Sequence, residues 1–141
     1  MAPIVVAVDY SEPSRKALDA AVALAEDLGL PLVMVHALAP PPAGSGRSLD
    51  PISQVKAEIG ADEARELATT WASKARKRVE VETVAREGKA VEVVLDEAKR
   101  RKASLIVVGS HGRSGLGRAV LGSVAEAIVR TSKVPIVVVP S

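Results

Sequence analysis

The sequence has no cysteine and almost no aromatic residues. It contains one Tyr, one Trp and no Phe among 141 residues, although hydrophobic residues make up 48% of the chain. The absence of Cys excludes disulfides, thiolate catalysis and Cys-ligated zinc. The core must therefore be built from Ala, Val, Leu and Ile, which suit β-strands covered by Ala- and Leu-rich helices.

Nucleic-acid binding and membrane insertion are both disfavoured. The 19 basic and 17 acidic residues nearly cancel, whereas a nucleic-acid-binding surface combines a basic stripe with stacking aromatic rings. The apolar run at residues 4–8 is too short for a signal or membrane-spanning segment. We therefore expect a cytoplasmic protein with neither kind of partner, and the length fits a single domain over residues 1–141.

Two hydrophobic periodicities alternate along the chain. Runs without polar alternation predict buried strands at residues 4–8, 32–35, 105–108 and 136–139, and a weaker strand at 78–85. Between them, apolar residues every three to four positions predict amphipathic helices around residues 18–28, 52–71, 91–98 and 124–128. The order βαβαβαβαβ predicts an α/β fold, with a parallel sheet and helices on both faces.

Proline and glycine indicate several boundaries. Gly29 and Pro31 predict the end of the first helix, and Asp50 before Pro51 predicts the start of the second. Residues 38–49 contain three consecutive prolines and a Gly-Ser-Gly segment, which predict an irregular connection. That connection is either a solvated loop or a lid beside a ligand site.

A ligand site is expected beyond the carboxyl ends of the strands, as in other open α/β sheets. Asp9, His36 and Gly109 directly follow or end three of the predicted strands. From Gly109 the chain reads GSHGRSGLGRAVLGS, with five glycines directly before a helix. Such a segment exposes backbone amides to a polyanion, although it can also be a tight connection with no ligand.

The helix after this segment is a candidate anion site. Ser123 with Glu126 three residues later predicts a capping box, so the helix would begin at Ser123 and present free amides to a phosphate. Arg113 and Arg118 could add positive charge. The segment is not a P-loop, because no Lys-Ser/Thr pair follows its last glycine, and it lacks the G-x-G-x-x-G fingerprint of dinucleotide-binding proteins.

The spacing Gly109-x2-Gly112-x9-Gly122-Ser123 resembles the nucleotide-binding signature of the ATP-binding universal stress proteins. The resemblance covers the whole chain, through the segments AVDYSE, SLIVVGSHG and KVPIVVV. It implies a Rossmann-like fold of the adenine nucleotide alpha hydrolase-like type, with five parallel strands in the order 3-2-1-4-5.

The resemblance also implies a set of ligand-binding residues. Asp9 would lie near the adenosine, Ala7 and Val8 along the pocket wall, Ala37 against adenine, and Val108 beside the nucleoside. The ribose and phosphate grip would consist of Gly109, Gly112, Arg113, Gly122, Ser123 and Val124. The ligand would be ATP, or alternatively ADP or AMP, with Mg²⁺ or Mn²⁺ held mainly through the phosphates.

Several of these residues have simpler interpretations. Asp9 could cap the first helix together with Ser11. His36 is interpreted as a packed histidine at a strand end rather than a ligand. His111 is interpreted as a polar loop residue rather than an acid or base, because the sequence gives it no paired carboxylate.

Three functions remain open at this point. The first is an ATP-binding regulator or switch of the stress response. The second is a slow ATPase or autophosphorylating enzyme, for which Ser110, His111, Ser114 and Ser123 are nearby groups without assigned roles. The third is a stress protein that binds no nucleotide and acts through protein contacts. In each case a homodimer is expected through the apolar segment that begins at Val134 and ends at Val139, since an exposed apolar edge strand needs a cover.

Overall fold

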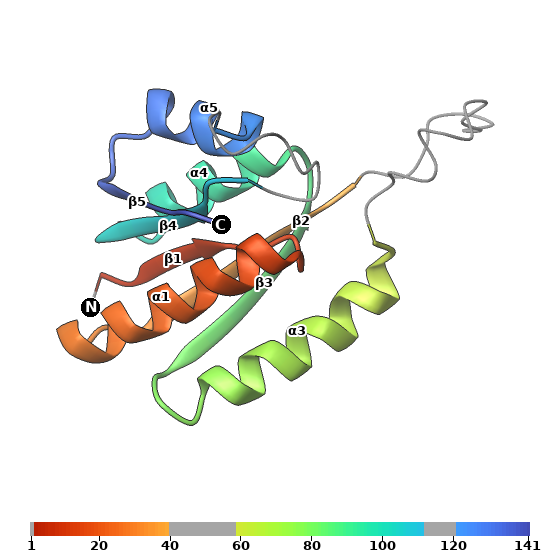
Figure 1. Cartoon of the computed structure of the whole chain (residues 1–141), viewed down its shortest axis with the longest axis vertical. Helices are drawn as coiled ribbons and strands as arrows, with labels where there is room; N and C mark the ends of the chain where they lie inside the picture. Colours follow the sequence, from red (N-terminus) through yellow and green to blue (C-terminus); the bar gives the residue numbers. More distant parts are fainter. Residues whose placement is uncertain (1, 40–58, 112–120) are drawn as a thin grey trace.

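The computed structural model describes residues 2–39, 59–111 and 121–141, and its strands form one parallel sheet (Figure 1). The strands are β1 (Ile4–Ala7), β2 (Leu32–Leu38), β3 (Val81–Glu87), β4 (Leu105–Gly109) and β5 (Ile136–Val139). Their order across the sheet is β3-β2-β1-β4-β5, and every pairing is parallel. The predicted α/β fold and strand order are confirmed.

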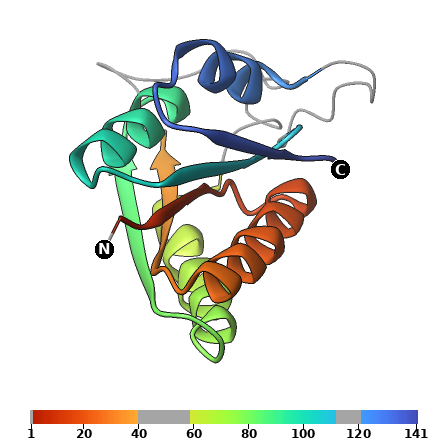
Figure 2. The same cartoon turned by 90° about the vertical axis from the view of Figure 1, so that its left-hand side faces the viewer.

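Four helices in the described residues cover the two faces of the sheet (Figure 2). Helices α1 (Glu12–Leu28) and α3 (Ala61–Ala75) lie on one face, and α4 (Ala90–Arg100) and α5 (Ser123–Thr131) lie on the other. The helix predicted at 52–71 corresponds to α3 only in part, because α3 begins at Ala61 after its N-cap Gly60. Its predicted start at Asp50 lies outside the described residues. So do all but the first two residues of the connection predicted at 38–49.

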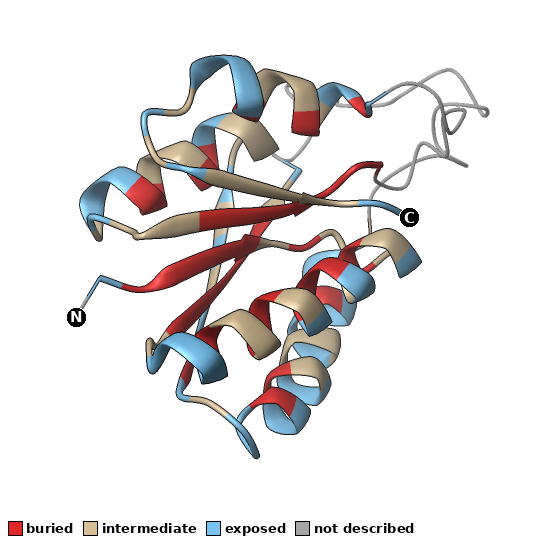
Figure 3. Ribbon diagram, turned by 60° about the vertical axis from the view of Figure 1, so that its left-hand side comes forward, coloured by how far each residue is buried: buried red, intermediate tan, exposed pale blue. Residues whose placement is uncertain are grey.

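The central strand β1 is buried on both of its faces (Figure 3). Ile4 and Val6 join the apolar cluster beneath α1 and α3, whereas Val5 joins the cluster beneath α4 and α5. All three side chains are fully buried, and each contributes roughly 1.5–3 kcal/mol relative to exposure. Burial on alternate faces explains why the strand reads as a continuous apolar run.

Helix α1 is bounded by local capping interactions. The Ser11 hydroxyl accepts a hydrogen bond from the Ser14 amide at the N-terminus, where Pro13 fits the first turn. At the other end Gly29 has a φ of 67°, and its amide donates to the carbonyls of Ala25 and Glu26. The predicted helix end at Gly29 is confirmed, because this left-handed conformation favours glycine.

One strand, β3, begins later than predicted. β3 begins at Val81 rather than residue 78, because the amides of Arg78 and Val79 still donate to the Ala75 carbonyl in the turn after α3. β5 begins at Ile136, as the apolar run at 136–139 predicts, so Val134 and Pro135 of the segment assigned to the dimer precede the strand. There the Ser132 hydroxyl donates to the Val134 carbonyl and accepts from the Val134 amide, which forms a turn before the strand.

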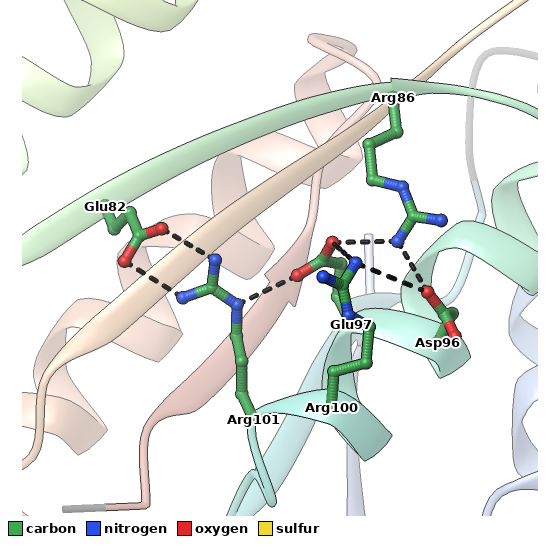
Figure 4. Close-up of polar contacts among 6 residues, drawn as sticks. All are labelled: Glu82, Arg86, Asp96, Glu97, Arg100 and Arg101. Atoms are coloured by element: carbon green, nitrogen blue, oxygen red, sulfur yellow. Dashed lines mark hydrogen bonds and ion pairs between the residues drawn. The ribbon is translucent and has the colours of Figure 1, made fainter.

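The buried carboxylate of Glu97 on α4 joins β3 to α4 (Figure 4). Arg101 Nε and Arg86 Nη1 each donate to it at 2.8 Å. Arg101 also forms a two-pronged pair with Glu82, and Arg86 contacts Asp96 at 2.6 Å. Burial opposes ionisation of Glu97, but the hydrogen bonds from Arg101 and Arg86 outweigh it, so the pKa of Glu97 is lowered.

Glu97→Gln is expected to lower the free energy of unfolding by about 1–3 kcal/mol at pH 7, because it removes a buried charge-assisted acceptor. The arginines are partly exposed, which limits the loss. Since folding lowers the Glu97 pKa, its contribution is present above the carboxyl's usual pKa and is lost as the pH falls through the lowered value. Urea titrations at pH 7 and pH 3 measure both effects.

Glu82→Gln is the matched control, because it removes an acceptor from the same Arg101 but from a more exposed position. We expect a smaller loss of stability. Equal losses in the two variants would contradict a special role for burial of Glu97.

Candidate functional site

The carboxyl ends of β1, β2 and β4 meet at one edge of the sheet. Ala7 pairs with Val35 of β2, and the Val8 amide extends this pairing with a hydrogen bond of 2.9 Å to the Val35 carbonyl. The structure brings four of the predicted site residues into the apolar cluster beneath α4 and α5: Ala7, Ala37, Val108 and Val124. These side chains share one face of the sheet at the expected edge.

Val8 does not contribute its side chain to that group. It is buried in the opposite cluster, beneath α1 and α3. The side chains of Ala7 and Val8 point to opposite faces because they alternate along an extended chain. Any contact of Val8 with a ligand on the α5 side is therefore made by its main chain.

Asp9 forms the turn between β1 and α1. Its Oδ1 accepts from the Ser11 amide at 3.0 Å and from the Ser11 hydroxyl, and its own amide donates to Ser14 Oγ at 3.3 Å. The interpretation of Asp9 as a partner of Ser11 in capping α1 is confirmed. The half-buried carboxylate remains at the strand edge, so capping and ligand binding are compatible roles.

Gly109 ends β4 where the chain passes close to α1. A Cβ at this position would lie 3.0 Å from the Pro13 carbonyl oxygen and 3.3 Å from the Pro13 carbonyl carbon. These neighbours are backbone atoms, which cannot rotate away as a side chain could. Close packing against α1 therefore favours glycine here, whatever else the position does.

The N-terminus of α5 differs from the prediction. The N-cap is Gly122, with φ −63° and ψ 157°, and Ser123 is the first helical residue. The predicted capping box is wrong, because no side chain among the described residues caps this helix and Glu126 pairs with Arg130 at 3.0 Å instead. The Gly122 amide donates to the Ser110 carbonyl at 2.6 Å, which holds the start of α5 beside the end of β4.

The two polar residues after β4 are buried. Ser110 and His111 are 8% and 7% exposed, and Ser110 Oγ lies 3.1 Å from His111 Nδ1. The Ser110 amide donates to the Val139 carbonyl at 2.8 Å, which fixes the main chain. A hydroxyl and an imidazole in contact form a possible nucleophile and base.

Tyr10 is a feature that the sequence interpretation missed. It has a φ of 62°, which is unusual for any residue but Gly, and burial raises its pKa to about 12. The centroid of its ring lies 4.8 Å from the Trp71 ring centroid and 4.9 Å from that of His36. The chain's Tyr and Trp are thus in contact next to Asp9. No local pattern shows this, since Trp71 is far away in the sequence.

Some predictions at this site lie outside the described residues, namely those for Gly112, Arg113, Ser114 and Arg118. Within the described ranges there is no group of three His, Asp or Glu side chains placed to hold a metal ion. No helix in the same ranges is long and apolar enough to cross a membrane.

The strand order and this edge define a doubly wound parallel α/β protein, a class that takes its ligands beyond the carboxyl ends of the strands. Residues 1–140 match the model of the Universal stress protein family. The chain belongs to that family. It is 34% identical over 143 residues to the Universal stress protein YxiE of Bacillus subtilis, with 96% of this chain and 97% of that protein covered.

Solved structures of the family have the same fold. The universal stress protein UspA from Lactobacillus plantarum matches with a TM-score of 0.80 at 23% identity, covering 98% of this chain and 97% of that one. An Archaeoglobus fulgidus protein in complex with dAMP matches at 0.69 and 27% identity, covering 98% and 97%. A universal stress protein in complex with cAMP matches at 0.70 and 26%, covering 99% and 96%.

Proposed function

We propose that this protein binds ATP at the carboxyl edge of its sheet and acts as a nucleotide-dependent regulator of the stress response. The observation that carries the proposal is the start of α5. Gly122 has no side chain that could accept from the first amides of α5, and its own amide bond to the Ser110 carbonyl holds the start of this helix beside the end of β4. Helix N-termini of this kind attract phosphates.

The N-terminus of α1 provides a useful contrast. The Ser14 amide donates to the Ser11 hydroxyl, Pro13 has no amide hydrogen, and Glu12 places a negative charge in the first turn. These features disfavour a further anion there. We therefore assign the phosphates to α5 and the nucleoside to the neighbouring strand ends, with Asp9, Ala37 and Val108 around it.

The ligand class is supported by the family members bound to dAMP and cAMP, which contain adenine. ATP rather than a monophosphate is favoured by the GSHGRSGLGRAVLGS segment, whose glycines and arginines suit a longer phosphate chain. In this proposal Mg²⁺ or Mn²⁺ accompanies ATP through the phosphate oxygens, without a cluster of protein ligands.

Isothermal titration calorimetry of the nucleotide-free protein with ATP and Mg²⁺ tests the proposal, with ADP and AMP in parallel. We expect saturable binding, tightest for ATP. Asp9→Ala is expected to weaken binding of all three nucleotides alike, since Asp9 is assigned to the shared nucleoside. The absence of binding heat at any temperature with millimolar ATP would refute the function.

The proposed assembly is a homodimer through β5. This strand occupies the sheet edge, and its four residues, Ile136, Val137, Val138 and Val139, are all half-buried and apolar. An apolar edge strand tends to pair with a second chain, and a second copy gives a closed two-fold assembly. Light scattering at micromolar concentration is expected to give twice the 14.6 kDa chain mass, and a monomer mass would contradict the dimer.

A second candidate function is slow phosphoryl transfer, favoured by the contact between Ser110 and His111. In that reaction Ser110 Oγ would bond to the γ-phosphorus, the bond to the bridging oxygen would break with release of ADP, and His111 would take the hydroxyl proton. Incubation with γ-labelled ATP would label the parent and not Ser110→Ala. A parent that binds ATP without labelling or ADP release would exclude this function.

A further inference from the structure

His36 contacts the residues on both sides of Asp9. Its Nδ1 donates to the Val8 carbonyl at 2.8 Å, and its ring lies 4.9 Å from the Tyr10 ring with the planes tilted by 52°. His36 belongs to β2 and is 4% exposed. One buried side chain from the neighbouring strand therefore holds the main chain before Asp9 and the side chain after it.

The conformation of Tyr10 depends on such contacts. Its left-handed backbone is disfavoured for a residue with a Cβ and persists where surrounding packing enforces it. The ring is held between His36 and Trp71, whose plane meets it at 75°. Arg15 Cζ lies 5.5 Å from the centroid of the Trp71 ring, so α1 also supports the group.

The second ring nitrogen of His36, Nε2, shows what a histidine contributes at this position that a phenylalanine would not. Nε2 is buried and has no hydrogen-bond partner among the described residues. An unpaired buried nitrogen is unfavourable, and a phenylalanine ring would avoid it. The chemical advantage of histidine at this position is therefore the hydrogen bond from Nδ1 to Val8.

We propose that His36 is a positioning residue for the nucleotide site, which fixes the main chain of Asp9 by clamping Val8 and Tyr10. This inference rests on the proposed function. Without the clamp, the turn that aims the Asp9 carboxylate loses its anchor in β2, and Tyr10 can relax from its left-handed conformation. The nucleotide must then order the turn on binding, which weakens affinity without requiring loss of the fold.

Two substitutions at His36 separate the hydrogen bond from the ring. His36→Phe keeps an aromatic ring against Tyr10 but cannot donate to Val8. His36→Asn places an amide NH₂ close to the position of Nδ1 and loses most of the ring. ATP titrations well below the melting temperature are expected to show an affinity about tenfold weaker for the Phe variant, the effect of one hydrogen bond. The Asn variant is expected to recover part of that loss.

Met34→Ala is the matched control. Met34 lies two residues earlier on β2, points to the same face and is 1% exposed, but it is not assigned to the turn. It should lower the melting temperature more than His36→Phe does and leave ATP affinity unchanged. If His36 acted only through stability, ATP affinity would fall together with the melting temperature in every variant. Met34→Ala would then lose more affinity than His36→Phe.

The outcomes distinguish this inference from the proposed function. If the parent binds ATP and His36→Phe binds it equally well, the positioning role is overturned while the function stands. Equal loss of affinity in Met34→Ala and His36→Phe also overturns it. A parent that does not bind ATP refutes the function and this inference together.

Discussion

Gly122→Val is expected to lower ATP affinity on the order of 100-fold, the effect of losing about two charge-assisted hydrogen bonds from backbone amides. Gly122 is the N-cap of α5, and its φ of −63° is one that any residue adopts. Its backbone conformation therefore does not require glycine. The proposed reason for glycine is close approach of a phosphate, which a branched side chain at the helix start would block.

Gly60→Val is the matched control for this prediction. Gly60 is the N-cap of α3 with φ −71° and ψ 165°, close to the values at Gly122, and a Cβ there lies within 4 Å of no atom of the described residues. Both variants should lose about 1 kcal/mol of stability from poorer capping. Calorimetric titrations should show normal ATP affinity for Gly60→Val. If Gly122→Val bound ATP as tightly as the parent, the phosphates would not bind at the start of α5.

Gly109→Ala is expected to lower the free energy of unfolding by about 1–3 kcal/mol, a typical result of overpacking. The added Cβ would lie 3.0 Å from the Pro13 carbonyl oxygen, so either the end of β4 or the first turn of α1 must move. Urea-induced unfolding followed by Trp71 fluorescence measures the change.

Gly60→Ala is the corresponding control, because its Cβ meets none of the described residues and only the cost of poorer capping, up to about 1 kcal/mol, is expected. A Gly109→Ala variant as stable as the parent would mean that the close approach to Pro13 imposes no constraint. In that case the glycine would be needed only for ligand binding.

The sequence predicts the sheet well because the relevant signals are local. Parallel strands buried on both faces read as continuous apolar runs, and β1 with its fully buried Ile4, Val5 and Val6 illustrates this. The end of α1 at Gly29 was predictable for the same reason, since the left-handed cap requires only one suitable residue. The expected ligand edge followed from strand order alone.

The sequence interpretation was wrong where two neighbouring residues could fill the same role, and it missed contacts between residues that are distant in the sequence. Gly122 and Ser123 are both acceptable N-caps, and the sequence favoured Ser123 because of Glu126, whereas the structure uses Gly122. Glu97 pairs with Arg101, which lies four residues later, and this spacing is visible in the sequence. Its pair with Arg86 of β3 joins two elements, so the sequence does not show it. The contact of His36 with Val8, next to Asp9, likewise depends on the pairing of β1 with β2.

The central claim is that the nucleotide binds at the carboxyl edge of the sheet, and backbone NMR during an ATP titration tests it most directly. The account predicts the largest amide shift changes at Asp9, Ala37, Gly109 and the first turn of α5. The opposite edge provides an internal comparison, since Gly29, Leu30, Arg78 and Glu80 line a hollow there. Shift changes concentrated at that hollow, or none at saturating ATP, would contradict the account.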